Sequence, residues 1–268
     1  MEELDEKFVS IRGARIRYVV RGTGAPVLLV HGLGEFLEAW YFTIPALSEY
    51  FRVYAMDLPG HGLSEQPPVD YSQRPGDNFA VDFMEAVGVE YASLVGHSLG
   101  GLICLDAAIN SEDKVDRLVL VDSGGLSNDV PLFYRLASLP VLGDIMIRPT
   151  TKAGVRSGMR RRFYNPEIVT DEWVEISYRY LKMPKMKDTL LKIIRGSVSV
   201  SGWRFTADLN TQLHLVKAPT LIVHGRQDNV VSVDDAYHIR EAIPGARLEV
   251  LDECGHNPHI EKATEFIK

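Results

Sequence analysis

A serine near the middle of the chain has a glycine two residues away on each side, in Gly96-His97-Ser98-Leu99-Gly100. An apolar run from Tyr91 to Val95 predicts a buried strand, and apolar residues at helical spacing from Leu99 to Ile109 predict a helix. Ser98 then lies in the sharp turn between them, where small residues let strand and helix approach closely. The pattern predicts either a nucleophilic hydroxyl or a glycine-rich turn whose serine caps the helix.

A serine hydroxyl is reactive at neutral pH only when a base lies within hydrogen-bonding reach and a carboxylate orients that base. Asp228 follows an apolar run at 218–223, and His256 follows another at 247–251. Loops that leave the carboxyl ends of parallel strands lie at one edge of the sheet, where ligands bind. We therefore expect Ser98, Asp228 and His256 to meet at that edge.

Strands and helices that could position these residues alternate along most of the chain. The predicted strands lie at 8–11, 14–20, 26–30, 51–56, 91–95, 117–121, 218–223 and 247–251. The predicted helices between them lie at 39–50, 77–87, 99–109 and 233–243. This alternation predicts an α/β fold, with a mostly parallel sheet and helices on both faces.

Residues 123–216 break this alternation. They contain no convincing strand, and helices are predicted at 171–183 and 187–197. The simplest arrangement is a helical cap inserted into a core made of residues 1–122 and 217–268. A chain of 268 residues is long enough for one large core that carries such an insertion.

Five motifs, in this order along the chain, resemble those of the α/β-hydrolase-fold family. They are His31-Gly32-Leu33-Gly34, Asp57 to Ser64, Gly96 to Gly101, His224-Gly225 with Asp228, and Gly255-His256. The resemblance covers almost the whole core. It implies the α/β-hydrolase fold with an inserted helical cap.

The same resemblance implies roles for the residues. Ser98 would be the nucleophile, His256 the general base and then acid, and Asp228 the orienting carboxylate. The backbone N–H groups of Leu33 and Leu99 would form the oxyanion hole, and Leu99 would also benefit from the dipole of its helix.

Each role has an alternative. Some family members draw the carboxylate from the position of Asp122, which also ends a strand. His259 is a second histidine near His256, although the preceding Pro258 indicates a loop position aimed elsewhere. We expect Asp57 to organise its own turn. The remaining histidines are expected to be structural, with ring nitrogens satisfied by nearby backbone: His31, His61 and His97.

This apparatus serves acyl transfer to water through an acyl-enzyme. The first interpretation is a carboxylesterase, a serine hydrolase acting on a small-molecule ester, and it needs no cofactor and no metal. Apolar cap residues favour a short-to-medium acyl group. They are Phe133, Leu136, Leu139, Leu142, Ile145, Met146, Phe163 and Phe205.

Two other interpretations remain open. The carbon–carbon hydrolases of the meta-cleavage-product type are similar in the core and in 139–143, but they typically place tryptophan where Asn257 follows His256. A non-catalytic ligand-binding member of the fold is also conceivable, since fold does not settle function. The tryptophans Trp40, Trp173 and Trp203 are expected in the core or in a pocket wall.

The predicted cap is basic. Residues 123–216 hold 14 Lys and Arg against 8 Asp and Glu, a balance of +6 in a chain of net charge -7. Such a cluster is usually a solvated face that pairs with acidic residues. The sharper hypothesis is an anionic ligand such as a coenzyme A thioester, which would make the protein a thioesterase. The residues concerned are Arg156, Arg160, Arg161 and Arg162.

Composition limits the other possibilities. With 46% hydrophobic residues and an acidic balance, the chain is typical of soluble globular proteins and is not expected to bind nucleic acid. The acidic N-terminus and the lack of a spanning apolar run predict a cytoplasmic protein without membrane association. Cys104 and Cys254 predict no disulfide framework. Only 11 Asn and Gln residues favour a heat-adapted source.

Overall fold

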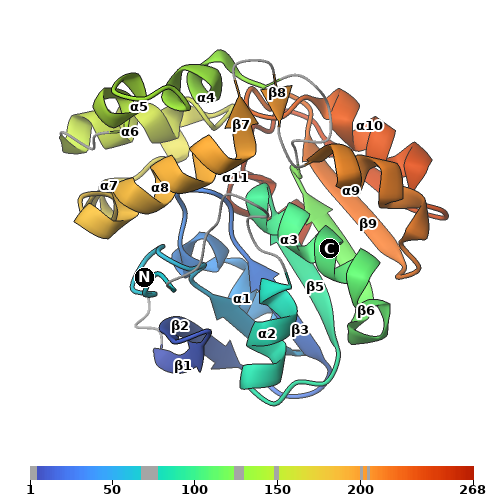
Figure 1. The fold of residues 1–268 in the computed structure, drawn as a ribbon. Coiled ribbons are helices and arrows are strands. Elements are labelled where there is room, and N and C mark those ends of the chain that lie inside the picture. Colours follow the sequence, from blue (N-terminus) through green and yellow to red (C-terminus); the bar gives the residue numbers. More distant parts are fainter. Residues whose placement is uncertain (1–4, 68–77, 124–129, 148–150, 200–201, 204–205) are drawn as a thin grey trace.

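A computed structural model gives the fold and describes residues 5–67, 78–123, 130–147, 151–199, 202–203 and 206–268. Its centre is an eight-stranded sheet (Figure 1). The strands are β1 (Lys7–Ile11), β2 (Ala14–Arg21), β3 (Pro26–Val30), β4 (Arg52–Met56), β5 (Ala92–His97), β6 (Val115–Val121), β9 (Thr220–Gly225) and β10 (Arg247–Leu251).

The strand order is β1-β2-β4-β3-β5-β6-β9-β10. β1 and β2 form an antiparallel hairpin, and β2 runs antiparallel to β4. All other neighbours in the sheet pair in parallel. The predicted α/β fold with a mostly parallel sheet is confirmed.

Helices of the core cover both faces of this sheet. They are η1 (Leu37–Trp40), α1 (Thr43–Leu47), α2 (Phe79–Ala86), α3 (Leu99–Asn110), η2 (Glu112–Lys114), α10 (Val233–Ala242), α11 (Pro258–Glu261) and α12 (Ala263–Phe266). Across the described part of the chain, no helix has both the length and the apolar surface that crossing a bilayer requires.

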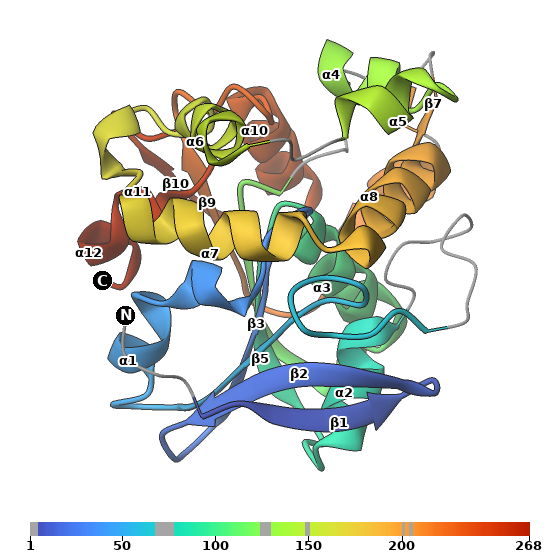
Figure 2. The ribbon, with the colours of Figure 1, turned by 90° about the vertical axis from the view of Figure 1, so that its left-hand side faces the viewer.

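Alternate residues of the buried strands point to opposite faces of the sheet. Leu28 and Val30 of β3 pack with α2, α3 and α10 in the larger apolar cluster. Val27 and Leu29 pack with η1 and α1 in the second cluster. In Figure 2 the sheet stands between α1 and α12 on one side and α2 and α3 on the other. This burial on two faces is what continuous apolar strands indicate.

The helix predicted at 39–50 is replaced by two short helices, η1 and α1. Pro45 has no N–H, so it cannot form the helical hydrogen bond that would reach the carbonyl of Tyr41. Pro45 instead lies in the first turn of α1, where a missing N–H is tolerated.

Between β6 and β9 the chain is mainly helical. It forms α4 (Leu132–Ala137), α5 (Leu142–Met146), α6 (Lys152–Arg160), η3 (Pro166–Ile168), α7 (Asp171–Leu181), α8 (Pro184–Ser197), β7 (Val198–Ser199), β8 (Gly202–Trp203), α9 (Thr206–Gln212) and η4 (Leu213–Leu215). Helices α4 to α8 gather at one end of the sheet in both views (Figures 1 and 2).

Two details of this segment differ from expectation. The absence of strands is wrong for β7 and β8, which pair over two residues each and are too short to show apolar alternation. Leu209 and Leu213 lie within the range predicted for the cap, but their side chains pack in the apolar cluster of the core that contains α3. The boundaries 123 and 216 of the cap stay a prediction.

A buried arginine ties α7 to the sheet. Arg17 of β2 is 2% exposed and binds Glu38 at 2.8 Å and Asp57 at 3.1 Å. The hydroxyl of Tyr180, in α7, donates to Glu38 at 2.8 Å. Asp57 also accepts from the N–H of Leu63, which confirms that it organises its own turn. Buried polar bonds thus anchor α7 to the core.

Candidate active site

Ser98 lies between β5 and α3, in the predicted turn. Its φ of +52° and ψ of −116° are strained for a residue with a side chain, at a cost of about 1–3 kcal/mol. A Cβ on Gly96 would lie 2.4 Å from the carbonyl oxygen of Gly100, so only glycine fits there. The Ser98 side chain forms no capping hydrogen bond to α3. The interpretation of Ser98 as a helix cap is therefore wrong.

Asp228 and His256 lie in the loops after β9 and β10 and form a hydrogen bond of 2.7 Å between Oδ2 and Nδ1. The other oxygen of Asp228 accepts from the N–H groups of Val230 and Val231. Burial acts to raise the pKa of Asp228, but the charge and hydrogen bond of His256 outweigh it and hold that pKa below its usual range. The ionised carboxylate keeps a proton on Nδ1 of His256, which leaves Nε2 free to act as a base.

The backbone of His256 is held as firmly as its ring. Its N–H donates to the carbonyl of Arg162 at 2.7 Å, and its carbonyl lies 2.7 Å from Nε2 of His97. His97 directly precedes Ser98, so these bonds place His256 beside the serine. Burial lowers the pKa of His256, although Asp228 opposes this effect. The imidazole is therefore neutral at pH 7, as a base must be.

The two predicted oxyanion donors also lie at Ser98. Leu99 is the first residue of α3, so its N–H has no partner within the helix. A Cβ on Gly32 would lie 3.1 Å from Cβ of Ser98, which puts the turn that carries Leu33 against the serine. A carbonyl oxygen between these two N–H groups would be stabilised as it becomes an oxyanion.

Asp122, the alternative carboxylate, is buried beside this site. Its Oδ1 accepts from the N–H of Gly225 at 2.9 Å and lies 3.4 Å from Nδ1 of His224. Burial, followed by the negative charge of Asp228, raises the pKa of Asp122 well above its usual range. Burial therefore favours the protonated form of Asp122, and the hydrogen-bond partner of His256 is Asp228.

His31 has the structural role predicted for it, with both ring nitrogens bonded to backbone, whereas His61 has a backbone partner at one ring nitrogen and none among the described residues at Nε2. Nε2 of His31 accepts from the N–H of Leu58 at 2.9 Å, and Nδ1 of His61 donates to the carbonyl of Pro59 at 3.0 Å. Burial lowers the pKa of His31 to about 4 and that of His61 to about 3. Both rings are neutral.

The loop predicted around His259 is wrong, because Pro258 begins the short helix α11. The ring of His259 is buried. Its centroid lies 4.4 Å from the ring centroid of Trp40 and 4.6 Å from that of His97. Burial holds its pKa well below the usual value. His259 is thus a packed neutral ring, whereas Asp228 orients His256.

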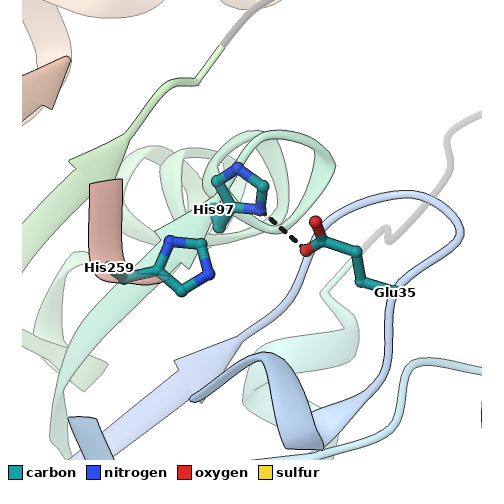
Figure 3. Close-up of side chains that lie close together, drawn as sticks. All are labelled: Glu35, His97 and His259. Carbon is teal, nitrogen blue, oxygen red and sulfur yellow. Dashed lines mark hydrogen bonds and ion pairs between the residues drawn. The ribbon is translucent and has the colours of Figure 1, made fainter. Parts of the chain in front are cut away.

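His97 departs from the predicted pattern at one nitrogen. Nε2 faces a backbone carbonyl as expected, but Nδ1 lies 2.8 Å from Oε2 of Glu35 (Figure 3). Glu35, His97 and His259 bring three metal-type donor atoms within 4.8 Å of one another. Two ligands of a tetrahedral zinc ion lie about 3.3 Å apart. The contact between Glu35 and His97 is shorter, as expected for a shared proton.

A short segment after α6, residues 161–165 and here named the strap, runs between the loops that carry Asp228 and His256. The side-chain amide of Asn229, next to Asp228, donates to the carbonyl of Arg161. The carbonyl of Arg162 accepts from the N–H of His256. The strap therefore bridges both loops of the candidate site.

One carboxylate completes this bridge. Glu261, in α11, accepts from the N–H of Gly255 at 2.7 Å. It also accepts from the N–H groups of Tyr164 and Asn165, in the strap. The loop before His256 and the strap thus share a single anchor.

The basic cluster is mostly neutralised by carboxylates. Three of its members form ion pairs: Arg156 with Asp171, Arg160 with Glu167, and Arg162 with Glu35. The pairs of Arg156 and Arg160, whose carboxylate partners are exposed, support the interpretation of a solvated face, whereas Arg162 is paired with the buried Glu35. Among the described residues, the structure pairs Arg161 with no carboxylate, and its side chain is exposed.

A cavity of about 810 Å³ lies between the cap helices and the oxyanion turn, a size that suits a small organic molecule. Leu33, Arg161 and Arg162 are among its lining residues. Four of the residues predicted in an acyl pocket or a pocket wall line it: Phe133, Met146, Phe163 and Trp173. Four others are not among its lining residues: Leu136, Leu139, Leu142 and Ile145. Phe205 and the side chain of Trp203 lie outside the described residues.

Sequence reasoning missed Glu35 and Glu261, which hold the site together. The signal for Glu35 was a carboxylate three residues after Gly32, among the mainly apolar residues 33–40, which also hold Glu38. Such a buried charge requires partners. The signal for Glu261 was weaker, because an acidic residue on a terminal helix is usually solvated.

Comparison with known proteins also indicates a hydrolase. The profile of the Alpha/beta hydrolase family matches residues 27–268. A 2-hydroxy-6-oxo-6-(2'-aminophenyl)hexa-2,4-dienoic acid hydrolase of Metapseudomonas resinovorans is 28% identical, over 97% of this chain and 88% of its own. An uncharacterised protein of Mycobacterium tuberculosis is 30% identical, over 97% of this chain and 78% of its own.

Solved structures are similar over the whole described fold. The chain matches the meta-cleavage product hydrolase from Pseudomonas fluorescens with a TM-score of 0.83 and 29% identity, over 97% of this chain and 94% of the other. It matches the 2-hydroxy-6-oxo-6-phenylhexa-2,4-dienoate hydrolase from Rhodococcus with a TM-score of 0.82 and 25% identity, over 98% and 96%.

Proposed function

Since this chain belongs to the alpha/beta hydrolase family, we propose that it is a serine hydrolase whose nucleophile is Ser98. The observation that carries the proposal is the hydrogen bond between Asp228 and His256 at the sheet edge where Ser98 lies in a strained turn. A serine, a neutral histidine and an ionised carboxylate suffice for acyl transfer, which requires no cofactor.

In the proposed mechanism, Nε2 of His256 takes the hydroxyl proton of Ser98 as the oxygen attacks a substrate carbonyl. The N–H groups of Leu33 and Leu99 stabilise the resulting oxyanion. As the intermediate collapses, the leaving group takes that proton from His256. Water then attacks the acyl-enzyme, with His256 again as base, and releases the carboxylic acid.

We propose that the bond cleaved is a carbon–carbon bond beside a ketone, in a substrate of the 2-hydroxy-6-oxo-2,4-dienoate type. Relatives named for such substrates match this chain over nearly its whole length, and this supports the assignment over simple esters. Cleavage requires the keto tautomer of the substrate, in which the proton of the 2-hydroxyl group has moved to C5. The bond between C5 and C6 then breaks to release a delocalised dienolate, and the proton from His256 converts this dienolate to the enol product.

The carboxylate of such a substrate suits Arg161. This residue lines the cavity, and the structure pairs it with none of the described carboxylates, whereas Arg162 is paired with Glu35. An arginine binds a carboxylate through two parallel hydrogen bonds. Relatives lend no support to a coenzyme A ligand, so we assign the basic cluster at most this one role at the site.

Ester hydrolysis is the second candidate, and Asn257 is the observation that favours it. The carbon–carbon hydrolases that the chain resembles typically carry tryptophan at this position, and Asn257 is instead buried and bonded to Glu35. The mechanism above applies without change, with an alkoxide as leaving group.

Parallel assays test both candidates. Wild type and Ser98→Ala are incubated with 2-hydroxy-6-oxo-6-phenylhexa-2,4-dienoate, followed by loss of its absorbance, and with p-nitrophenyl butyrate. We expect the larger kcat/KM on the dienoate, and covalent labelling of Ser98 by a fluorophosphonate. Turnover of the ester alone assigns the second candidate. A folded protein that neither reacts nor labels is a binding protein, which contradicts the proposal.

A further inference from the structure

We propose that Glu35 and His97 form a buried ion pair that positions His256 and the oxyanion turn, with His97 carrying a proton on both ring nitrogens. The inference rests on the proposed function, because it assigns a role beside the proposed catalytic residues. Glu35 and His97 are positioning residues, because they act through His256 and through the turn at Gly32–Leu33.

The partners of His97 set its protonation. Nε2 lies 2.7 Å from the carbonyl oxygen of His256, which can only accept, so Nε2 must donate. Nδ1 lies 2.8 Å from Oε2 of Glu35. If Glu35 is ionised, Nδ1 must donate as well, and the ring is an imidazolium. The charge on Glu35 therefore decides the charge on His97.

Glu35 is surrounded by donors. Its Oε2 accepts from the N–H of Gly32 at 3.0 Å, and its Oε1 accepts from the amide of Asn257 at 2.8 Å and from Arg162 at 3.4 Å. Burial acts to raise the pKa of Glu35, but the guanidinium of Arg162 opposes this effect, and the N–H groups of Gly32 and Asn257 stabilise the ionised form independently of His97. An ionised carboxylate with four donors is the arrangement that buried charges require.

Figure 3 shows the pair joining segments far apart in the sequence, the loop after β3 and the end of β5. Through Gly32, Glu35 fixes the turn that presents Leu33 to the substrate. Through its carbonyl, His256 is fixed by His97, the residue before Ser98. Nucleophile, base and one oxyanion donor are thus held by one buried charge pair.

The pair also has an electrostatic effect on His256. The two rings lie 4.8 Å apart, and a positive charge on His97 adds to burial in lowering the pKa of His256. The other titratable groups that face His97 include His259, whose ring centroid lies 4.6 Å away, and Asp122, His31 and His224. Burial lowers the pKa of the three histidines and raises that of Asp122, so it disfavours a charge on each of them.

Nitrogen NMR of histidine-labelled protein tests the pair directly. In the wild type at pH 7, we expect both ring nitrogens of His97 to show the shifts and couplings of protonated nitrogens. In Glu35→Gln, the amide can donate to Nδ1, so we expect one protonated and one bare nitrogen. Glu38→Gln is the matched control, because it removes a buried charge from the same connection whose partners are Arg17 and Tyr180.

Kinetics test the role. In Glu35→Gln, His97 is neutral and no longer lowers the pKa of His256. The acid limb of the pH profile of kcat/KM, which reports the protonation of His256, should therefore move to higher pH in Glu35→Gln. It should stay in place in Glu38→Gln. We also expect kcat and the rate of fluorophosphonate labelling to fall about tenfold, with KM within twofold. Replacing a residue with a purely structural role would not change the pH at which this acid limb occurs.

Two results overturn the inference: a bare ring nitrogen on His97 in the wild type, or an unchanged acid limb in folded Glu35→Gln. The NMR measurement uses unmodified protein and needs no turnover. A protein that fails to hydrolyse any substrate therefore contradicts the proposed function, whereas the spectrum of His97 still decides the ion pair.

Discussion

Replacing Asp228 by asparagine should abolish most activity without unfolding the protein. Oδ1 of Asp228 accepts from the N–H groups of Val230 and Val231, at 2.7 and 3.2 Å. Asparagine can keep these bonds only by placing its oxygen there, so its NH₂ group must face Nδ1 of His256. The imidazole then carries its proton on Nε2, and it cannot take the proton of Ser98.

The loss should be large. In a serine–histidine–aspartate triad, the wrong tautomer costs about 10⁴-fold in kcat, and each tenfold corresponds to about 1.4 kcal/mol. The expected loss in Asp228→Asn is therefore about 5 kcal/mol of transition-state stabilisation. Urea unfolding should change by less than about 1 kcal/mol, since the two backbone bonds are retained.

Asp122→Asn is the matched control, one strand away in the sheet. Asp122 is buried, which raises its pKa, and its Oδ1 accepts from the N–H of Gly225. Asparagine has the shape of the protonated acid and keeps this acceptor, so kcat should fall less than tenfold. Steady-state assays on the preferred substrate compare the two variants. Equal losses, or a larger loss in Asp122→Asn, would refute the assignment of Asp228.

Two further outcomes are expected. Gly100→Ala should lose most activity and more than about 2 kcal/mol of stability, because its Cβ would lie within 2.6 Å of two backbone carbonyl oxygens at the end of β3. Gly101→Ala should lose less in the same assays, because its Cβ would meet mainly the side chain of Ser123 and lie 3.1 Å from one backbone oxygen, that of Gly96. His31 and His61, with pKa values lowered to about 4 and about 3, bind fewer protons folded than unfolded below pH 6.5. Each should therefore remove at most about 1.4 kcal/mol of stability per pH unit as the pH falls from about 6.5 to the folded pKa, and equal urea midpoints at pH 7 and pH 5 would contradict this.

The centre of the sheet could be predicted because strands such as Pro26–Val30 are buried on both faces. The edge strand Arg247–Leu251 is also found with the predicted bounds, although none of its residues is fully buried. The turn at Ser98 was predictable as well, since two glycines flank a serine between a strand and a helix. Local spacing determines these features, so they are readable without the rest of the fold.

The network behind the site was not predictable in the same way. Glu35 is bonded to His97, Asn257 and Arg162, which lie 62, 222 and 127 residues away along the chain. No periodic pattern encodes such pairings, because tertiary packing alone brings the partners together. The cytoplasmic location and the heat-adapted source also stay predictions.

The strap limits how the cap of this enzyme can be transplanted. A chimera that imports a foreign segment for residues 130–199 keeps the hydrogen bond to the N–H of His256 only if its backbone places a carbonyl where that of Arg162 lies. If its backbone does not also place two N–H groups at the positions of Tyr164 and Asn165, Glu261 retains one of its three backbone donors, Gly255. We expect such a hybrid to fold but to be inactive. A cap taken from another protein should therefore be transferred together with that protein's own strap and with the residue that it carries at the position of Glu261.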